Sequence, residues 1–198
     1  MTFVWAGTPV VESPGRGTFY NGPMRSKRTK WMIAAAVAAV AAVLTVGLLH
    51  GGDGPSAPIA LDRNTPLPAI TGKDLVTGRT LDLATYQGKP LFINAWAEWC
   101  IECREEAPVL RRFAAAHPEI AVVGLVGNSA HDRAIKVNRE LGWPWPSIFD
   151  PNGMIVLTTL DLQNYPSTLF VDSNGVLRGM KRGVVTEDEL ADVVKRLT

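Results

Sequence analysis

Apolar and polar residues follow one another along this chain in blocks that predict an anchor, a linker and one α/β domain. The first long apolar block, residues 31–49, contains no charged residue and is rich in Ala, Val and Leu. At about 1.5 Å of rise per residue, a helix over this block is roughly as long as a bilayer core is thick. A basic flank precedes the block and predicts a cytoplasmic N-terminus with export of the rest; it consists of Arg25, Lys27, Arg28 and Lys30.

The apolar block divides the chain into four predicted parts. We expect residues 1–30 to be a short, disordered cytoplasmic segment, 31–49 a transmembrane anchor, 50–64 a flexible Gly- and Pro-rich linker, and 65–198 one domain of ordinary size. A cleaved signal peptide is an alternative for the apolar block, although the small-residue site downstream is poor. A buried soluble helix is another alternative. Met24 stands just before the basic flank and is an alternative translation start.

The domain shows alternating strand-like and helix-like periodicity, which predicts an α/β fold. In chain order we expect a short strand at 80–83 paired near Ile70, a buried strand at 90–96, a helix at 100–116, a buried strand at 120–126, a helix at 130–141 on the other side of that strand, strands at 168–172 and 176–181, and a last helix. Asn174 and Gly175 between the last two strands predict a hairpin, because both tolerate positive φ. Thr186 and Glu189 predict a capping box at the start of the last helix.

Cys100 and Cys103 are the only cysteines in the chain. They lie where the predicted strand 90–96 leads into the next helix, at the edge of the sheet where open α/β proteins place their sites. Free amides and the positive dipole at the helix start stabilise a thiolate on Cys100, and a lowered thiol pKa makes a nucleophile. Cys103, one turn later, is placed to attack a mixed disulfide and release the partner.

Two closely spaced cysteines can also serve a metal site, haem attachment or a structural disulfide. A zinc site needs two further ligands, but there is no third cysteine and His50, His117 and His131 are scattered. Haem attachment needs a His after the second cysteine, where this chain has Arg104. A purely structural disulfide stays open for an exported protein, although so short a loop gains little chain entropy.

The residues around the cysteines resemble a known family. The stretch WAEWC at 96–100 resembles the active-site entry of thioredoxin, and the following CREEAP at 103–108 is closer to the membrane-anchored, extracytoplasmic thioredoxin-like oxidoreductases of the TlpA, ResA and CcmG type. The stretch NYPSTLFVD at 164–172 resembles the later Pro-Thr-strand segment of that family. The resemblance covers roughly residues 65–198 and implies a thioredoxin-like fold, a central mixed sheet flanked by helices.

The same resemblance assigns roles to residues at the site. Cys100 would attack and Cys103 would resolve. Pro166 would be the cis-proline that faces the disulfide, since a cis bond costs little only before proline. Tyr165 would present its backbone to a bound substrate chain, so Tyr165 and Pro166 are candidate substrate-binding residues. Trp99, directly before Cys100, is a third candidate as part of the active-site surface, with packing within the domain as the alternative.

One acidic residue is expected to assist the exchange. Thioredoxins carry a buried Asp six residues before the first cysteine, and here that position is Asn94, which cannot take a proton. The anchored group places a Glu three residues after the second cysteine, and here that residue is Glu106. One helical turn from Cys103, its carboxyl can accept the Cys103 proton during resolution. The alternative is a solvated first-turn Glu that only complements the helix dipole.

The resemblance therefore implies a thiol–disulfide oxidoreductase on a single-pass anchor, with its domain outside the cytoplasmic membrane. It implies reduction of disulfides in exported proteins, with apocytochrome c before haem attachment as a candidate substrate and a membrane thiol carrier as electron donor. Glu102 beside Cys100 disfavours the thiolate and hence favours a reductant, unless its side chain points into solvent and is screened. We expect no metal or other cofactor. The formal net charge of +1 gives no overall field that attracts nucleic acid.

Two rival functions stay open. A peroxidase of the peroxiredoxin type shares the fold, but it needs a Thr three residues before the reactive cysteine, where this chain has Ala97. A non-enzymatic copper- or partner-binding module is the second rival, although copper-handling relatives usually space their cysteines by three residues and add a His.

Overall fold

The computed structural model describes residues 31–33, 35–38 and 58–197 of the chain. The chain divides into two compact units, Met1–Gly54 and Pro55–Thr198. In the first unit the described residues have a helical backbone. Among the described residues, no helix has the length and apolar character that crossing a membrane requires. Most of the predicted anchor, the predicted cytoplasmic segment and the first part of the predicted linker lie outside the described residues.

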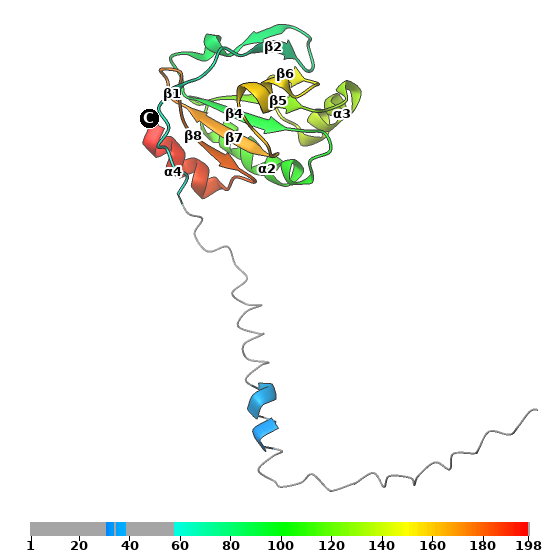
Figure 1. The fold of residues 1–198 in the computed structure, drawn as a ribbon, viewed down its shortest axis with the longest axis vertical. Coiled ribbons are helices and arrows are strands. Elements are labelled where there is room, and N and C mark those ends of the chain that lie inside the picture. The colour runs from blue at the N-terminus through cyan, green and yellow to red at the C-terminus, as the bar shows by residue number, and fades with distance from the viewer. Residues whose placement is uncertain (1–30, 34, 39–57, 198) are drawn as a thin grey trace, which may run out of the picture. The chain divides into compact units, whose positions relative to one another are not determined.

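An eight-stranded mixed sheet forms the centre of the second unit, in the order β1-β8-β7-β4-β5-β6-β2-β3 (Figure 1). The central strand β4 (Leu91–Trp96) is buried at every position, and it pairs parallel with β5 (Ala121–Gly127) and antiparallel with β7 (Ser167–Val171). An apolar run buried on both faces is typical of such a central strand. The remaining strands are β1 (Thr65–Pro66), β2 (Thr71–Asp74), β3 (Thr80–Asp82), β6 (Ser147–Asp150) and β8 (Val176–Arg182).

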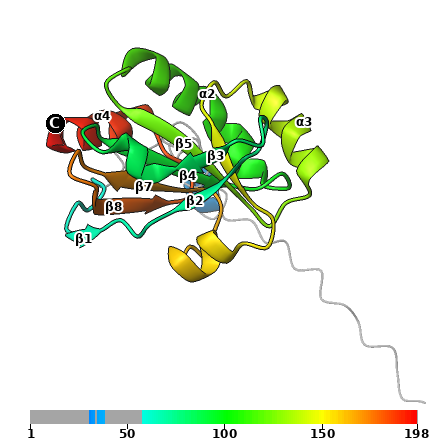
Figure 2. The same cartoon turned by 90° about the horizontal axis from the view of Figure 1, so that it is seen from above.

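The three long helices lie on one face of this sheet (Figure 2). They are α2 (Ile101–Ala116), α3 (His131–Leu141) and α4 (Glu187–Leu197), while the short helices are η1 (Leu83–Tyr86) and η2 (Met154–Thr159). Because β4, β5 and β6 follow one another as parallel neighbours, right-handed crossovers place α2 and α3 on the same face. The prediction that put the helix 130–141 on the other side was therefore wrong. It lacked β6, so the direction of the second crossover was undetermined.

Alternate positions of β4 separate two hydrophobic cores, as the period of two along a strand requires. Phe92 faces α2, where its ring stacks on Phe113 with 5.1 Å between centroids. Ile93 belongs to the second core, together with Val156 of η2. Asn94 shares the face of Phe92, so a polar residue of the central strand lies beneath α2.

Two sequence signals near the C-terminus are confirmed. Gly175 has a φ of 77° in the turn between β7 and β8. At the start of α4 the Thr186 amide donates to Glu189 Oε2 at 2.9 Å, and the Glu189 amide donates to Thr186 Oγ1 at 3.3 Å. These reciprocal bonds make the expected capping box.

The folded unit extends upstream of residue 65, into the stretch assigned to the linker. Ile59 is 5% exposed and belongs to the core that also holds Phe92. Its carbonyl oxygen accepts a hydrogen bond from Arg196 Nη2 at 2.6 Å. Residues 58–64 pack on the domain because burying the apolar side chain of Ile59 stabilises that arrangement. The sequence signal for this packing was an apolar residue within a Gly- and Pro-rich stretch.

Candidate active site

The structure joins Cys100 and Cys103 in a disulfide with 2.02 Å between the Sγ atoms. Cys100 is the N-cap residue of α2, and its Sγ accepts a hydrogen bond from the Cys103 amide at 3.0 Å. The N-cap is the position at which a side chain satisfies the free amides of a helix start. Cys100 is 3% exposed and Cys103 1% exposed. A reduced Cys100 thiolate would accept from the same amide, and a hydrogen bond of this kind favours the charged form.

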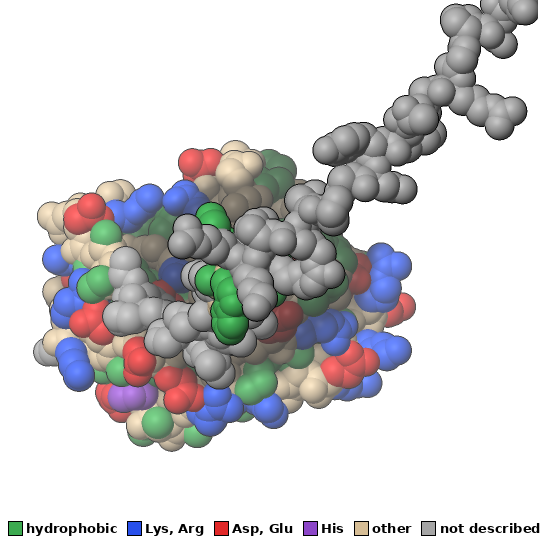
Figure 3. All heavy atoms as spheres, turned by 90° about the horizontal axis from the view of Figure 1, so that it is seen from below, with side chains coloured by type: hydrophobic (Ala, Val, Ile, Leu, Met, Phe, Trp, Pro, Cys, Tyr) green, Lys and Arg blue, Asp and Glu red, His purple; other side chains and the backbone are tan. Residues whose placement is uncertain are grey.

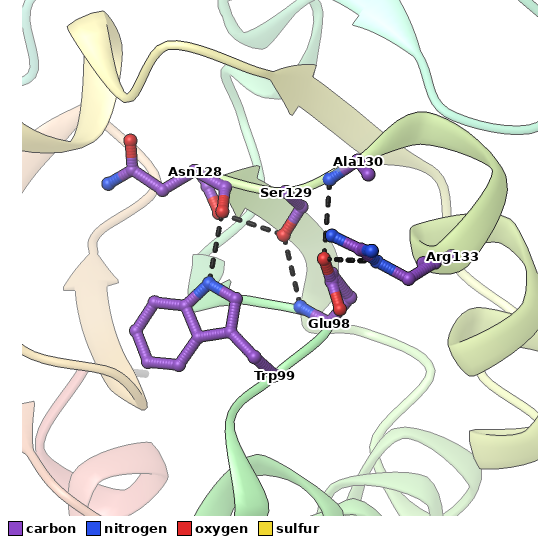
Figure 4. A network of polar contacts seen from close by, with 7 residues as sticks. Glu98, Trp99, Asn128, Ser129, Ala130 and Arg133 are labelled. Atoms are coloured by element: carbon purple, nitrogen blue, oxygen red, sulfur yellow. Dashed lines mark hydrogen bonds and ion pairs between the residues drawn. The ribbon is translucent and has the colours of Figure 1, made fainter.

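Glu98 holds the turn before the cysteines against α3 (Figure 4). Its Oε1 accepts from Arg133 Nε at 2.8 Å and from the Ala130 amide at 3.4 Å. Ala130 has no side chain that can cap α3, so the Glu98 carboxylate supplies the negative charge that a helix start favours. The Glu98 amide donates to Ser129 Oγ at 3.0 Å, and Ser129 Oγ donates to the Gly127 carbonyl at 2.9 Å. The active-site turn is thereby fixed to both β5 and α3.

Trp99 is exposed but held in place. Its side chain is 58% exposed, while its Nε1 donates to the Asn128 carbonyl at 3.0 Å (Figure 4). The ring meets the Tyr165 ring edge-on, with 5.6 Å between centroids. Asn128 has a φ of 48°, a conformation that Asn tolerates better than most residues. An ordered aromatic surface therefore stands next to the disulfide.

A groove of about 590 Å³ lies beside this surface. It is lined by Trp99, Tyr165 and Pro166, the three residues that the sequence proposed for substrate contact. The Tyr165–Pro166 peptide bond is cis, as expected. The groove also has lining residues that the sequence did not single out for contact: Glu102, Asn128, Leu157, Gln163, Asn164, Arg182 and Gly183.

Tyr165 depends on a glycine below it. A Cβ at Gly127 would lie 2.0 Å from the Tyr165 hydroxyl oxygen, so only glycine leaves room for this ring. Burial, and next the negative charge of Asp150, raise the pKa of Tyr165 to about 12. The phenol is therefore neutral at physiological pH.

Glu106 lies on the face of α2 that packs on the sheet, and it is fully buried, with 0% exposure. Its Oε1 accepts from Asn94 Nδ2 at 2.8 Å, and its Oε2 accepts from the Val185 amide at 3.2 Å. Burial raises the pKa of Glu106 to about 7, although the two hydrogen bonds favour the charged form and act in the opposite direction. The alternative of a solvated first-turn Glu is therefore wrong.

Sequence reasoning recognised Asn94 only as a position without the usual acid. The structure shows that its amide bridges Glu106 and Thr168, since Nδ2 also donates to Thr168 Oγ1 at 3.1 Å. The available signal for a buried role of Asn94 was its position in an apolar strand. Asn94 precedes Trp96 by two residues and therefore shares the strand face that α2 covers. The Val185 contact had no local signal, because it joins residues 79 positions apart.

No group of three or more His, Cys, Asp or Glu side chains that could hold a metal ion occurs in the part of the chain that the structure describes. His117 Nδ1 lies 2.8 Å from Glu119 Oε1, and His131 Nδ1 lies 3.6 Å from Asp132 Oδ1. Neither pair includes a cysteine.

Known proteins are similar to this chain in sequence and fold. The model of the AhpC/TSA family matches residues 64–180. The thiol:disulfide interchange protein DsbE of Pseudomonas fluorescens biotype C is 35% identical over 131 residues, which cover 64% of this chain and 72% of that relative. DsbE of Escherichia coli K12 is 40% identical over 93 residues, 46% of this chain and 49% of that relative. The solved structure of MTB dsbF, in mixed oxidized and reduced forms, matches with a TM-score of 0.60 at 28% identity, over 65% of this chain and 95% of that one.

Proposed function

We propose, from the premise that the chain belongs to the AhpC/TSA family and is a thiol–disulfide oxidoreductase related to DsbE, that it reduces disulfides of exported proteins. The observation that carries this proposal is the Cys100–Cys103 disulfide at the start of α2, beside the groove lined by Trp99, Tyr165 and Pro166. A substrate chain in that groove would bring its own disulfide to Cys100. The aromatic faces provide apolar contact area for it.

The exchange proceeds in two balanced steps. The Cys100 thiolate attacks one substrate sulfur, so that a Cys100–substrate S–S bond forms, the substrate S–S bond breaks, and the other substrate sulfur leaves as a thiolate. Cys103 then attacks Cys100 Sγ, which forms the Cys100–Cys103 bond and releases the second substrate thiolate. Two electrons pass to the substrate. This turnover would leave the Cys100–Cys103 pair in the disulfide form that the structure contains.

Glu106 accepts the Cys103 proton in the second step. It lies on α2 three residues after Cys103, and residues at this spacing are neighbours on one helix face. With a pKa near 7, its carboxyl is partly ionised at neutral pH, where a general base is most useful. The Asn94 and Val185 N–H groups orient the two carboxyl oxygens.

The proposed direction of electron flow rests on Glu102, which lies in the first turn of α2. Its charge opposes the Cys100 thiolate and so favours the disulfide over the dithiol, an effect that solvent screening reduces because Glu102 is exposed. A protein with this preference gives electrons to its substrates and must be re-reduced by a membrane thiol carrier. Apocytochrome c before haem attachment is the candidate substrate that the CcmG-type resemblance implies. Residues 31–49 would anchor the domain on the outer side of the cytoplasmic membrane.

Trapping the mixed disulfide tests this function. The reduced full-length chain is mixed with a peptide disulfide, and wild type is compared with Cys100→Ser and Cys103→Ser. We expect Cys103→Ser to accumulate a covalent Cys100–peptide adduct, because resolution is blocked, and Cys100→Ser to form none. Intact-mass spectrometry measures both. Equal adduct formation in the two variants would contradict the assignment of attacker and resolver.

The two rival functions are tested on the same reduced protein. We expect disulfide reduction to exceed consumption of hydrogen peroxide by orders of magnitude, since Ala97 is fully buried and carries no hydroxyl beside Cys100. For the copper-binding rival, the reduced protein is titrated with copper(I) and its disulfide reduction is measured separately without copper. We expect the copper-free protein to reduce the peptide disulfide. Peroxide turnover as fast as disulfide exchange, or stoichiometric copper binding without exchange, would replace the proposed function.

A further inference from the structure

A row of polar side chains crosses the sheet beneath α2 and α4. Asn94 on β4, Thr168 on β7 and Lys181 on β8 are direct cross-strand neighbours. Glu106 lies at the β4 end of the row, on Asn94, and Glu189 lies at the β8 end, where its Oε1 accepts from Lys181 Nζ at 2.6 Å. The row therefore connects the proposed proton acceptor to an ion pair that the mechanism above does not use.

The Lys181–Glu189 pair is largely removed from solvent. The Glu189 side chain is 2% exposed and the Lys181 side chain 29% exposed. A buried carboxylate needs a cationic partner and hydrogen-bond donors. Glu189 has both, since its Oε2 also accepts from the Thr186 amide at 2.9 Å. Removing Lys181 would leave this carboxylate without its cation.

Two buried carboxylates hold adjacent amides of one loop. Glu106 Oε2 accepts from the Val185 amide, and Glu189 Oε2 accepts from the next amide, that of Thr186. The position of the Val185 N–H on Glu106 is thus coupled to the position of Glu189. Glu189 in turn is held by Lys181.

We infer that the Lys181–Glu189 ion pair is a positioning element for Glu106, which holds the Val185 amide on its carboxyl and so controls when that carboxyl releases its proton. The catalytic meaning of this inference rests on the proposed function of Glu106. Without Lys181, Glu189 either leaves the loop or stays as an unpaired anion. The first removes a donor that favours the charged Glu106, and the second adds a like charge nearby. Both raise the pKa of Glu106.

The direct hydrogen-bond partners of Glu106 are neutral. The Lys181–Glu189 pair is the nearest charged group that the contacts connect to it. From the sheet it meets the neutral side chains Asn94 and Thr168 along the row, and from the loop before α4 it meets the Val185 amide. Lys181 from β8 and Glu189 from α4 complete the row. Of the other charged side chains of the same elements, Arg178 and Asp192 are half-buried. The rest are exposed: Glu102, Arg104, Glu105, Arg111, Arg112, Arg182, Glu187, Asp188, Lys195 and Arg196.

Direct titration of the Glu106 carboxyl tests the inference. Carbon-13 NMR of the oxidised full-length chain would follow that carboxyl in wild type, Lys181→Gln, Lys181→Met and Lys181→Arg. We expect its pKa to rise by about one unit in the Gln and Met variants, and to return to near the wild-type value with Arg, which keeps the ion pair. Lys181→Met retains an apolar stem, so it decides the matter if Lys181→Gln does not fold.

Arg112→Gln is the matched control. It removes an exposed ion pair to Glu187, also between α2 and α4, in which the side chains are 62% and 58% exposed. We expect no change in the Glu106 titration. An unchanged titration in both neutral Lys181 variants would overturn the inference, as would equal shifts in Arg112→Gln.

A separate experiment distinguishes failure of the proposed function. The pH profile of disulfide exchange in Lys181→Gln should shift together with the Glu106 titration, whereas Glu106→Gln should lose the inflection near neutral pH. If Glu106→Gln keeps the wild-type profile, Glu106 has no part in the exchange, although a Lys181-dependent titration would still show the positioning. If Glu106→Gln loses the inflection but the Lys181 variants titrate as wild type, only the positioning fails.

Discussion

At the scale of single residues, Glu106 shows how burial and hydrogen bonding set the chemistry of a carboxyl. Burial alone would favour the neutral acid, while the Asn94 and Val185 N–H groups favour the carboxylate, and the balance places the pKa at about 7. Asn94 cannot ionise, but it can donate. The chain therefore places an acid on the helix and an amide on the strand, and the amide orients the acid.

The same pKa predicts a pH-dependent stability. The pKa of Glu106 is raised from 4.5 to about 7 by folding, so between these values the folded chain keeps a proton that the unfolded chain has lost. The contribution of Glu106 to the free energy of unfolding is fully present below about pH 4.5. It is lost as pH rises to about 7, by an amount on the order of 3 kcal/mol. We expect Glu106→Gln to remove this fall, because Gln does not titrate. Urea unfolding of both oxidised proteins at about pH 5 and pH 8 measures it, and parallel pH dependences would contradict it.

At the scale of elements, local signals predicted most strands and helices, but not their mutual placement. The apolar run of β4, the hairpin signal at Gly175 and the capping box of Thr186 each lie within a few residues, so the sequence displays them directly. The strand β6 (Ser147–Asp150) is short and follows a Trp- and Pro-rich stretch, which masks its period. The contact of Glu98 with Arg133 spans 35 positions and depends on how β4 and β5 align.

That contact gives a prediction about the active-site turn. The Glu98 side chain is 10% exposed and accepts hydrogen bonds from the Arg133 guanidinium and the Ala130 amide. Glu98→Ala therefore removes the acceptor at the start of α3 and the ion-pair partner of Arg133. We expect a loss of about 1–2 kcal/mol in the free energy of unfolding and slower disulfide exchange, since the turn before Cys100 is no longer fixed to α3. Urea denaturation and the exchange rate measure these effects.

Glu140→Ala is the control for the Glu98 variant. It removes the Arg104–Glu140 pair between α2 and α3, whose side chains are 42% and 44% exposed, and pairs of this kind contribute roughly 0–1 kcal/mol. Equal losses of stability in the two variants, or an unchanged exchange rate in Glu98→Ala, would show that the Glu98 contacts do not support the active site.

At the scale of the whole molecule, surface charge and site position favour protein substrates. Lys and Arg side chains alternate with Asp and Glu on the face shown in Figure 3, and the formal net charge of the chain is +1. Such a mixed surface produces no extended positive field of the kind that polyanions require. Trp99 and Glu102, the sequence neighbours of Cys100 and Cys103, instead line a groove with aromatic walls, so recognition would depend on shape and apolar contact near the substrate cysteine.

The proposed anchor predicts how the full chain distributes between fractions. Residues 31–49 carry no charge, and we expect the chain to stay in the membrane pellet after alkaline carbonate extraction, at its full mass or at the mass of a start at Met24. Ala39→Arg with Val43→Arg should move it to the soluble fraction, because each arginine near the centre of a span costs about 2.5–3.5 kcal/mol on insertion scales. Ala39→Leu with Val43→Leu, the matched control, should stay in the pellet. A soluble exported chain whose mass corresponds to a start downstream of residue 50 would show a cleaved signal peptide and contradict the anchor.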